Sequence, residues 1–482
     1  MATTFVGRRV APWLPVTKKP LRLPLWLSLL WLLLIKIPIW IVLLVARSPV
    51  TLTVCSFLVV TLAAYRLAGL LMVIGVYLAV VGAFLWVRFH RPEFFERHVA
   101  LLIRSRWRGS MYRSKWRATM DLAEMATYRS TGARYEPLVL SVSSNRCVDR
   151  VRVRMLAAQT VEDWGKATAR LCQTFGAHDA RVRSVPGRPH EVELWFLISD
   201  PLDAVVEPQQ DQVPVDLAAL PVGRREDGEV YHLPLLGSHV LLVGATGAGK
   251  SSVIWSVIDQ LAPAIADGTV KCWGLDPKGM ELSAGAALFD RMAYESPEDY
   301  AELLEDAVLV MRERQAALRG VTRVHQPTKA EPLIVVLIDE LAALSYVNDR
   351  DVRRRIENAL GLLLSQGRAV GVSVVGAVQD PRKEVLPSRD LFPVRVCLRV
   401  VEAEQVRLVL GPGARDRGAR ADEISYSLPG VGFVQVDGVA EPVRVRFAYV
   451  SDDHIRTLAE GWAPAKAPLF FEVIPGGKDA AA

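Results

Sequence analysis

The chain has 482 residues, of which 51% are hydrophobic, and a formal net charge of +6. This length exceeds what one ordinary hydrophobic core accommodates, so we expect two or three structural units. Five scattered cysteines, without a CxxC pair or a His/Cys cluster, argue against a disulfide framework and against a zinc site. A reducing, cytosolic environment is therefore expected for the water-soluble part.

Apolar residues are concentrated in residues 23–88, ahead of a sequence that reads as water-soluble. The run from Leu25 to Val45 has about the length that a helix needs to cross a bilayer. A second run, residues 50–87, is long for one spanning helix and short for two. Because basic residues precede the first run and follow the second, both ends are predicted to be cytoplasmic. We expect a multi-pass anchor in the cell membrane, with two helices favoured over three.

Nine Lys and Arg residues lie between residues 88 and 117, against two Glu residues. Such a cluster is typical of the cytoplasmic flank of a membrane helix. Contact with anionic lipid or with DNA phosphates is the alternative interpretation.

Two further regions follow the basic cluster. In residues 134–203, short alternating strands and the amphipathic segment Val161–Phe175 predict a small α+β domain. From His239 onward, strands alternate with helices, which is the pattern of a parallel, doubly wound α/β sheet covered on both faces. Its predicted strands are His239–Val243, Val270–Leu275, Leu333–Ile338 and Val370–Val378, and the helix after the first one is predicted to run from Lys250 to Leu261, before Pro263.

A phosphate-binding pattern, GxxxxGK[ST], lies between the first of these strands and its helix. It comprises Gly244, Ala245, Thr246, Gly247, Ala248, Gly249, Lys250 and Ser251. In this position backbone N–H groups and the helix N-terminus can surround phosphates. Lys250 is expected to reach the β- and γ-phosphates, and the Ser251 hydroxyl to contact Mg²⁺. The sequence therefore predicts a site for ATP and Mg²⁺.

Two carboxylates end the buried strand Leu333–Ile338. Hydrolysis requires a carboxylate that holds the metal and a group that orients the attacking water. We assign the first role to Asp339 and the second to Glu340. Together with the phosphate-binding loop they predict a Mg²⁺-dependent ATPase.

Other strand ends should deliver residues to the same edge of the sheet, where ligands of α/β proteins bind. Gln379, after the strand Val370–Val378, is a candidate sensor of the γ-phosphate. Asp276 and Lys278 are equally compatible with a functional role and with a structural salt bridge. Arg368 and Arg395 are candidates for the arginine that a neighbouring subunit supplies to the γ-phosphate in many such assemblies. For each arginine, an ordinary surface role is the alternative.

The motor region, roughly residues 222–462, resembles the FtsK/SpoIIIE family of membrane-anchored DNA translocases. The resemblance rests on ordered segments: His239–Val243 leading into the phosphate-binding loop, Asp276-Pro277-Lys278 followed by Glu281-Leu282-Ser283, Ile338-Asp339-Glu340, Ala377-Val378-Gln379-Asp380-Pro381, and Val443–Arg446 before Val450-Ser451-Asp452. It implies a RecA-like P-loop domain, a homo-oligomeric ring of six subunits, and ATP-driven movement of double-stranded DNA. The sequence departs from the family pattern at Asp380, where the family usually has arginine.

The layout, with a short anchor, one motor and about 20 residues after Trp462, is similar to that of translocases from actinobacterial conjugative plasmids and integrative elements. Conjugative DNA transfer is therefore the expected function. Chromosome segregation in division or sporulation is one alternative. A protein-secretion ATPase of the type VII class is another, although such chains usually contain several ATPase domains, and this sequence shows one P-loop.

The predicted organisation has seven parts. They are a cytoplasmic N-terminal segment (1–22), a membrane anchor (23–88), a basic juxtamembrane segment (89–133), the α+β domain (134–203), a linker (204–221), the ATPase motor (222–462) and a C-terminal tail (463–482).

Overall fold

The computed structural model describes residues 49–128, 133–209, 214–382 and 386–464. The chain divides into two compact units, Met1–Val99 and Ala100–Ala482. The predicted span Leu25–Val45 and most of the C-terminal tail lie outside the described residues.

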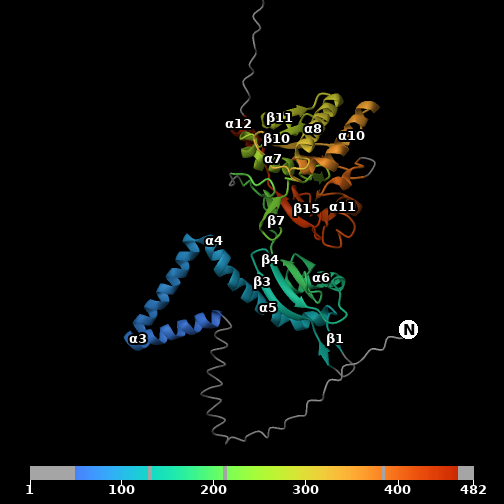
Figure 1. Cartoon of the computed structure of the whole chain (residues 1–482). Helices are drawn as coiled ribbons and strands as arrows, with labels where there is room; N and C mark the ends of the chain where they lie inside the picture. The colour runs from blue at the N-terminus through green and yellow to red at the C-terminus, as the bar shows by residue number, and fades with distance from the viewer. Residues whose placement is uncertain (1–48, 129–132, 210–213, 383–385, 465–482) are drawn as a thin grey trace, which may run out of the picture. The chain divides into compact units, whose positions relative to one another are not determined.

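The first unit contains one long helix, α3 (Pro49–His90), followed by the short α4 (Pro92–Phe94) and a π-helical segment that begins at Phe95. Within α3, Gly69–His90 is long and apolar enough to cross a membrane, with a mean hydropathy of 2.6. Gly69 has a φ of 73°, in the left-handed region, and Figure 1 shows a sharp bend within α3. The described residues thus provide one candidate span, and the expected multi-pass anchor is not supported by them.

The second unit begins with helix α5 (Leu101–Leu122) and a small antiparallel sheet. The sheet has the order β3-β4-β6-β5, and helix α6 completes the domain. The bounds are β3 Leu138–Ser144, β4 Val148–Arg154, α6 Val161–Phe175, β5 Asp179–Ser184 and β6 Glu191–Leu197, with a two-stranded ribbon, β1 Thr127–Tyr128 and β2 Arg134–Tyr135, beside them. Helix α6 begins with a capping box formed by Thr160 and Asp163 and ends at Gly176, which has a φ of 66°.

Helix α5 packs into this domain, although the sequence analysis placed residues 89–133 outside it. Tyr112, Trp116 and Met120 are buried in the same core as Trp164 and Phe196. Their spacing follows one face of a helix, but the surrounding charges conceal that pattern in the sequence. One of these charges, Arg108, has its Nε 2.5 Å from the buried carboxylate of Asp149. Part of the basic cluster therefore stabilises the domain.

The motor contains a ten-stranded mixed sheet in the order β11-β10-β12-β13-β9-β14-β15-β16-β7-β8. The first six strands of this order are mutually parallel, and the remaining pairings are antiparallel. The strands are β7 Leu220–Arg225, β8 Val230–Leu233, β9 Val240–Val243, β10 Val270–Leu275, β11 Phe289–Ala293, β12 Leu333–Ile338, β13 Val372–Val378, β14 Val394–Leu398, β15 Val431–Val436 and β16 Val443–Phe447. The motor is therefore a mixed α/β domain with a parallel-rich sheet.

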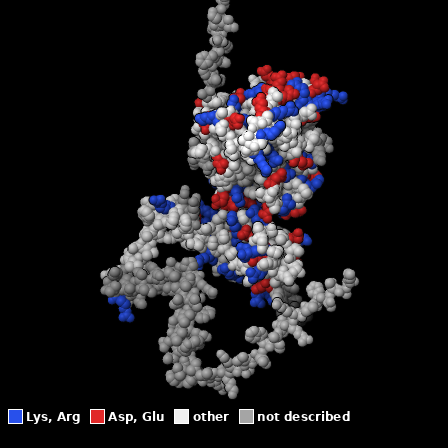
Figure 2. All heavy atoms as spheres, in the orientation of Figure 1, with Lys and Arg blue, Asp and Glu red and all other residues white. Residues whose placement is uncertain are grey.

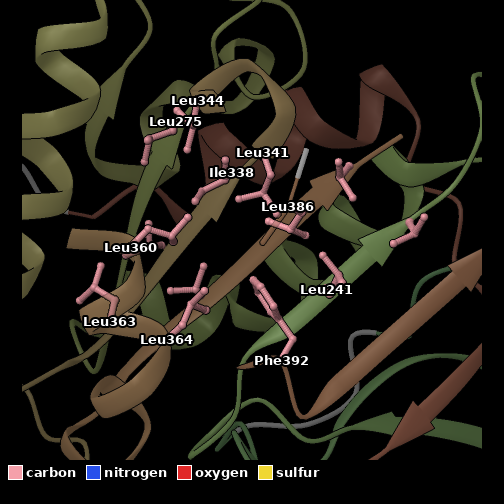
Figure 3. Packing of buried hydrophobic residues seen from close by; sticks show 14 of the residues in the cluster. Leu241, Leu275, Ile338, Leu341, Leu344, Leu360, Leu363, Leu364, Leu386 and Phe392 are labelled. Atoms are coloured by element: carbon pink, nitrogen blue, oxygen red, sulfur yellow. The ribbon is translucent and has the colours of Figure 1, made fainter. Parts of the chain in front are cut away.

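Both faces of the parallel strands are buried, which explains their continuous apolar sequences. Alternate residues of β9 and β12 belong to two different hydrophobic clusters, one on each face. One face is covered mainly by α7 and α12, and the other by α8 and α10, which lie side by side (Figure 1). Figure 3 shows the second cluster, in which Leu241 and Ile338 of the sheet meet Leu360, Leu363 and Leu364 of α10. The helices are α7 Lys250–Ala266, α8 Pro297–Leu318, α9 Leu341–Ser345, α10 Arg350–Gln366, α11 Ala403–Leu410 and α12 Asp452–Trp462.

Helix α7 continues past Pro263 to Ala266, one turn further than predicted. Proline inside a helix costs about 3 kcal/mol because it removes a hydrogen bond and crowds the preceding turn. Leu261, Ala262, Ala264 and Ile265 are all buried, so packing against the sheet offsets this cost. Figure 2 shows that acidic and basic side chains are interspersed over the visible face of the motor.

His239, just before β9, makes the stability of the motor depend on pH. Its ring is fully buried, and its Nδ1 accepts the N–H of Val374 at 3.0 Å. Burial, assisted by Arg368, lowers the pKa of His239 to about 4. The unfolded chain binds a proton near pH 6.5 and the folded chain only near pH 4, so stability falls as the pH drops below 6.5. We expect a loss of about 2 kcal/mol between pH 7 and pH 5, from 1.4 kcal/mol per pH unit.

Denaturant unfolding of the wild type and of His239→Asn at both pH values tests this expectation. Asparagine retains an acceptor for the Val374 N–H but does not titrate in this range. The variant should lose that part of the pH dependence. An identical dependence in both proteins would contradict the assignment to His239.

Candidate functional site

The phosphate-binding loop connects β9 to α7 at the carboxyl edge of the parallel strands. Strand β13 lies between β9 and β12, so the residues after β13 separate the loop from the residues after β12. The topology therefore brings Gln379, Asp339 and Glu340 to the loop, as the sequence predicted for parallel strands that end at one edge.

Two glycines allow the loop its conformation. Gly247 and Gly249 have φ values of 70° and 95°, in the left-handed region. A Cβ on Gly249 would lie 2.3 Å from the backbone nitrogen of Gly430. That nitrogen donates to the carbonyl of Ala248 at 2.9 Å. The segment before β15 thus packs directly on the loop and requires glycine at position 249.

Lys250 and Ser251 are both held within the site. Lys250 Nζ donates to the carbonyl oxygen of Gly244 at 3.0 Å, so the side chain folds back over the loop. Burial lowers the pKa of Lys250, and the nearby carboxylate of Glu340 opposes this effect. Ser251 Oγ donates to Glu281 Oε2 at 2.5 Å. Their positions suit the phosphate and metal contacts that the motif predicts.

Asp339 and Glu340 are buried carboxylates at the end of β12. Burial raises the pKa of Asp339 to about 6, and Lys278 opposes the shift. Lys278 Nζ lies 3.8 Å from Asp339 Oδ2 and 3.6 Å from Glu340 Oε2. Asp339 Oδ2 and Glu340 Oε1 have no hydrogen-bond donor within the part of the chain that the structure describes. Buried carboxylate oxygens without a donor suit a hard cation such as Mg²⁺.

The described residues contain no group of three or more His, Cys, Asp or Glu side chains that could hold a metal ion.

Gln379 connects the loop to the carboxylate of Glu340. Its Nε2 donates to Glu340 Oε2 at 3.1 Å, and its Oε1 accepts from the Thr246 hydroxyl at 3.2 Å. A single amide therefore contacts both sides of the site, where it can respond to the terminal phosphate.

Asp276 and Lys278 do different things. The fully buried Asp276 accepts the backbone N–H of Leu282 at 2.9 Å through its Oδ2, which orders the loop after β10. Lys278 pairs with the two carboxylates of β12 as described above. Asp276 therefore orders this loop, while its Oδ1 has no hydrogen-bond partner among the described residues, and Lys278 lies in the site.

Neither candidate arginine reaches the site within its own subunit. Arg395 is near the start of β14, opposite Leu241, and its guanidinium contacts Asp437 at 3.0 Å. Arg368 lies in a short 3-10 turn before β13 and is exposed. Both positions are toward the amino-terminal edge of the parallel strands, opposite the phosphate-binding loop. A contribution from either arginine to a neighbouring subunit stays a prediction.

Two site residues were missed by the sequence analysis. Arg399 directly follows β14, donates to the Thr246 carbonyl at 2.9 Å, and stacks 3.9 Å from the ring centroid of Tyr426. The rule that identified Gln379, a polar residue after a parallel strand, also applies to Arg399. Glu281 was noted only as part of a family motif, and its contact with Ser251 depends on the fold of the loop after β10.

The site opens into a cavity of about 610 Å³. A cavity of this size is within the range of small-molecule sites. It is lined by Val205, Ala245–Ser252, Lys278, Glu281, Asp339, Gln379, Pro429, Arg446, Phe447 and Tyr449.

Comparison with known proteins agrees with this geometry. Residues 202–326, which include the phosphate-binding loop, match the FtsK/SpoIIIE family. The DNA translocase FtsK of Halalkalibacterium halodurans is 27% identical over 315 residues, covering 60% of this chain and 38% of that protein. The DNA translocase FtsK of Streptomyces coelicolor is 25% identical over 404 residues, covering 77% and 42%. This chain thus spans less than half the length of these relatives.

Two solved structures are also similar. The pCW3 conjugation coupling protein TcpA, solved with ATPγS, has a TM-score of 0.48 and 18% identity, covering 72% of this chain and 98% of that one. The cytoplasmic domain of the Thermomonospora curvata type VII secretion ATPase EccC has a TM-score of 0.42 and 22% identity, covering 56% and 34%.

Proposed function

We propose that this chain is a membrane-anchored ATPase that moves double-stranded DNA, in the conjugative transfer of a plasmid or integrative element. The observation that carries the proposal is the bridge from Thr246 through Gln379 to Glu340, which joins a phosphate-binding loop to a buried carboxylate. The family match and the two FtsK relatives support DNA as the substrate.

In the proposed reaction the loop amides and Lys250 hold the β- and γ-phosphates. Lys250 exchanges its contact with the Gly244 carbonyl for the phosphate oxygens. Ser251 and Asp339 would hold Mg²⁺, which neutralises charge on the β- and γ-phosphates when it is bound. Glu340 orients and polarises the attacking water.

Gln379 changes partners when the γ-phosphate leaves, because it contacts the loop and Glu340 at once. We propose that the domain is RecA-like and assembles into a ring of six subunits around the DNA, with the apolar α3 region as its membrane anchor. A neighbouring subunit would supply the missing cation, for which Arg368 and Arg395 are the candidates.

Steady-state hydrolysis by the full chain in detergent, with and without linear duplex DNA at low salt, tests the function. We expect duplex DNA to stimulate ATP hydrolysis. Lys250→Ala should abolish hydrolysis, since removal of a preorganised cation at the phosphates costs about 10² or more in rate. Lys271→Ala is the matched control, because Lys271 of β10 pairs with Asp290 of β11 and does not line the site. Hydrolysis that duplex DNA leaves unchanged at low salt would contradict a DNA motor and favour the secretion alternative.

A further inference from the structure

Arg399 is a buried cation beside the phosphate-binding loop. It directly follows β14, and it is 6% exposed. Within the ranges that the structure describes, no carboxylate forms an ion pair with its guanidinium. Because burying a charge is costly unless the charge is paired or hydrogen-bonded, other contacts must hold this arginine in place.

Arg399 contacts the loop at two successive residues. Its carbonyl oxygen accepts the N–H of Ala245 at 2.9 Å, and its guanidinium Nη2 donates to the carbonyl oxygen of Thr246, also at 2.9 Å. The first contact involves only the backbone, so any side chain at position 399 can keep it. The second contact requires a donor at the end of the side chain.

The guanidinium of Arg399 also stacks on the ring of Tyr426. Its Cζ lies 3.9 Å from the ring centroid, a distance at which a cation is attracted to the face of the ring. Tyr426 is 79% exposed, so this contact can be removed without opening the hydrophobic core. Four residues later, Gly430 donates to the carbonyl of Ala248 at 2.9 Å. One segment therefore supports the loop directly at Ala248 and, through Arg399, at Thr246.

Thr246 connects Arg399 to the groups that act on the nucleotide. Its carbonyl accepts from Arg399, and its hydroxyl donates to Gln379 Oε1 at 3.2 Å. Gln379 donates in turn to Glu340 Oε2 at 3.1 Å. A path of contacts thus runs from Arg399 through Thr246 and Gln379 to Glu340. In the described part of the chain, the lining of the cavity does not include Arg399.

We propose that Arg399 is a positioning residue for ATP hydrolysis, which holds Thr246 so that Gln379 and Glu340 are aligned with the γ-phosphate and the attacking water. The inference rests on the proposed function, because it takes the roles of Gln379 and Glu340 from there. Arg399 is distinct from the arginine that a neighbouring subunit would supply, since it acts within its own subunit and through Thr246.

Loss of the Arg399 side chain should therefore affect turnover more than nucleotide binding. Lys250 and the loop amides still hold the phosphates, and the backbone contact with Ala245 remains. Only the support of the Thr246 carbonyl is lost. A small displacement of groups that position a reaction lowers its rate by up to about 10²-fold.

Steady-state hydrolysis by the full chain and calorimetric binding of a non-hydrolysable ATP analogue test the role. Arg399→Met fills a similar volume without a donor, and it should lower kcat about 30-fold to 100-fold while the affinity for the analogue changes by less than about threefold. Arg399→Lys retains a charged donor, so it should recover about a tenfold part of that loss. A wild-type kcat in Arg399→Met would overturn the proposal. So would a weakened affinity with unchanged kcat, which would indicate direct phosphate binding.

A double-mutant cycle with Gln379 separates positioning from a general structural effect. Gln379→Ala should itself lower kcat by a similar factor. If Arg399 acts through Gln379, adding Arg399→Met to Gln379→Ala should lower kcat by less than about threefold more, because residues that act as a unit give non-additive effects. Equal fold-losses in the two backgrounds would overturn the proposal.

Tyr426 provides a second test that does not depend on a buried substitution. Tyr426→Ala removes the stacking partner at an exposed position and should lower kcat about threefold, the size of one exposed cation–π contact. Tyr426→Phe keeps the ring and should retain the wild-type kcat. If Arg399→Met does not fold, an unchanged kcat in Tyr426→Ala overturns the proposal on its own.

The matched controls remove an arginine and a tyrosine elsewhere on the motor. Arg355→Ala breaks a surface pair with Glu305, and Tyr294→Ala replaces a ring that is 50% exposed; both positions are outside the cavity lining. Both variants should keep the wild-type kcat and affinity. Failure of the proposed function is separate, since it would appear in the wild type as hydrolysis that DNA does not stimulate.

Discussion

Replacing Glu340 with glutamine is expected to reduce ATP turnover by about 10²–10⁴, the usual contribution of a general base. Glu340 is buried at the end of β12, and its Oε2 accepts from Gln379 at 3.1 Å. Glutamine has the same shape and can still accept that hydrogen bond through its carbonyl oxygen. It cannot take a proton from water, so Glu340→Gln should bind ATP but not hydrolyse it.

The measurement is steady-state hydrolysis combined with calorimetric binding of a non-hydrolysable ATP analogue. Glu313→Gln, at an exposed position on α8, is the matched control and should hydrolyse ATP at the wild-type rate. A turnover number for Glu340→Gln within a factor of a few of the wild type would contradict the assigned role. The assigned role would also be contradicted if Glu340→Gln lost its affinity for the ATP analogue but hydrolysed ATP at the wild-type rate.

The second large effect is expected at Gly249. Alanine in the left-handed region costs about 1–2 kcal/mol. Its Cβ would also lie 2.3 Å from the Gly430 nitrogen, which must then move away from the Ala248 carbonyl. Loss of that hydrogen bond adds about 1 kcal/mol. Gly249→Ala should therefore lower the free energy of unfolding by about 2–3 kcal/mol in total, and the displaced loop should bind ATP at least tenfold more weakly.

Denaturant unfolding and nucleotide titration measure the two effects. Gly361→Ala is the matched control, because Gly361 lies within α10 with open space around its Cβ position. Replacing a helical glycine by alanine should leave ATP affinity unchanged and raise stability by about 0.5–1 kcal/mol. If Gly249→Ala and Gly361→Ala had the same free energy of unfolding and the same affinity for ATP, the contact between Gly249 and Gly430 would not determine the loop conformation.

The features that depend on local sequence could be predicted without a structure. The phosphate-binding loop has a fixed spacing, and apolar strands such as Leu333–Ile338 end in recognisable polar residues. Because the carboxyl ends of parallel strands lie at one edge of the sheet, Gln379 was expected to lie near Glu340. In the structure the two side chains are hydrogen-bonded.

Features that depend on long-range packing could not be predicted from the sequence. The antiparallel register of β14, β15 and β16 is needed to bring Tyr449 to the cavity. In α5, the basic residues conceal a buried face that includes Tyr112 and Trp116. Helix α7 continues beyond Pro263 because Ala264 and Ile265 are buried there. Helix propensity describes only the local sequence, so it does not predict this burial.

Displacement of a triplex-forming strand from a linear duplex tests the central claim most directly. The full chain should displace the strand when ATP and Mg²⁺ are present. Glu340→Gln should bind ATP and the duplex but leave the triplex intact, because movement requires hydrolysis. A wild-type chain that hydrolyses ATP at low salt and never displaces the strand would contradict the account.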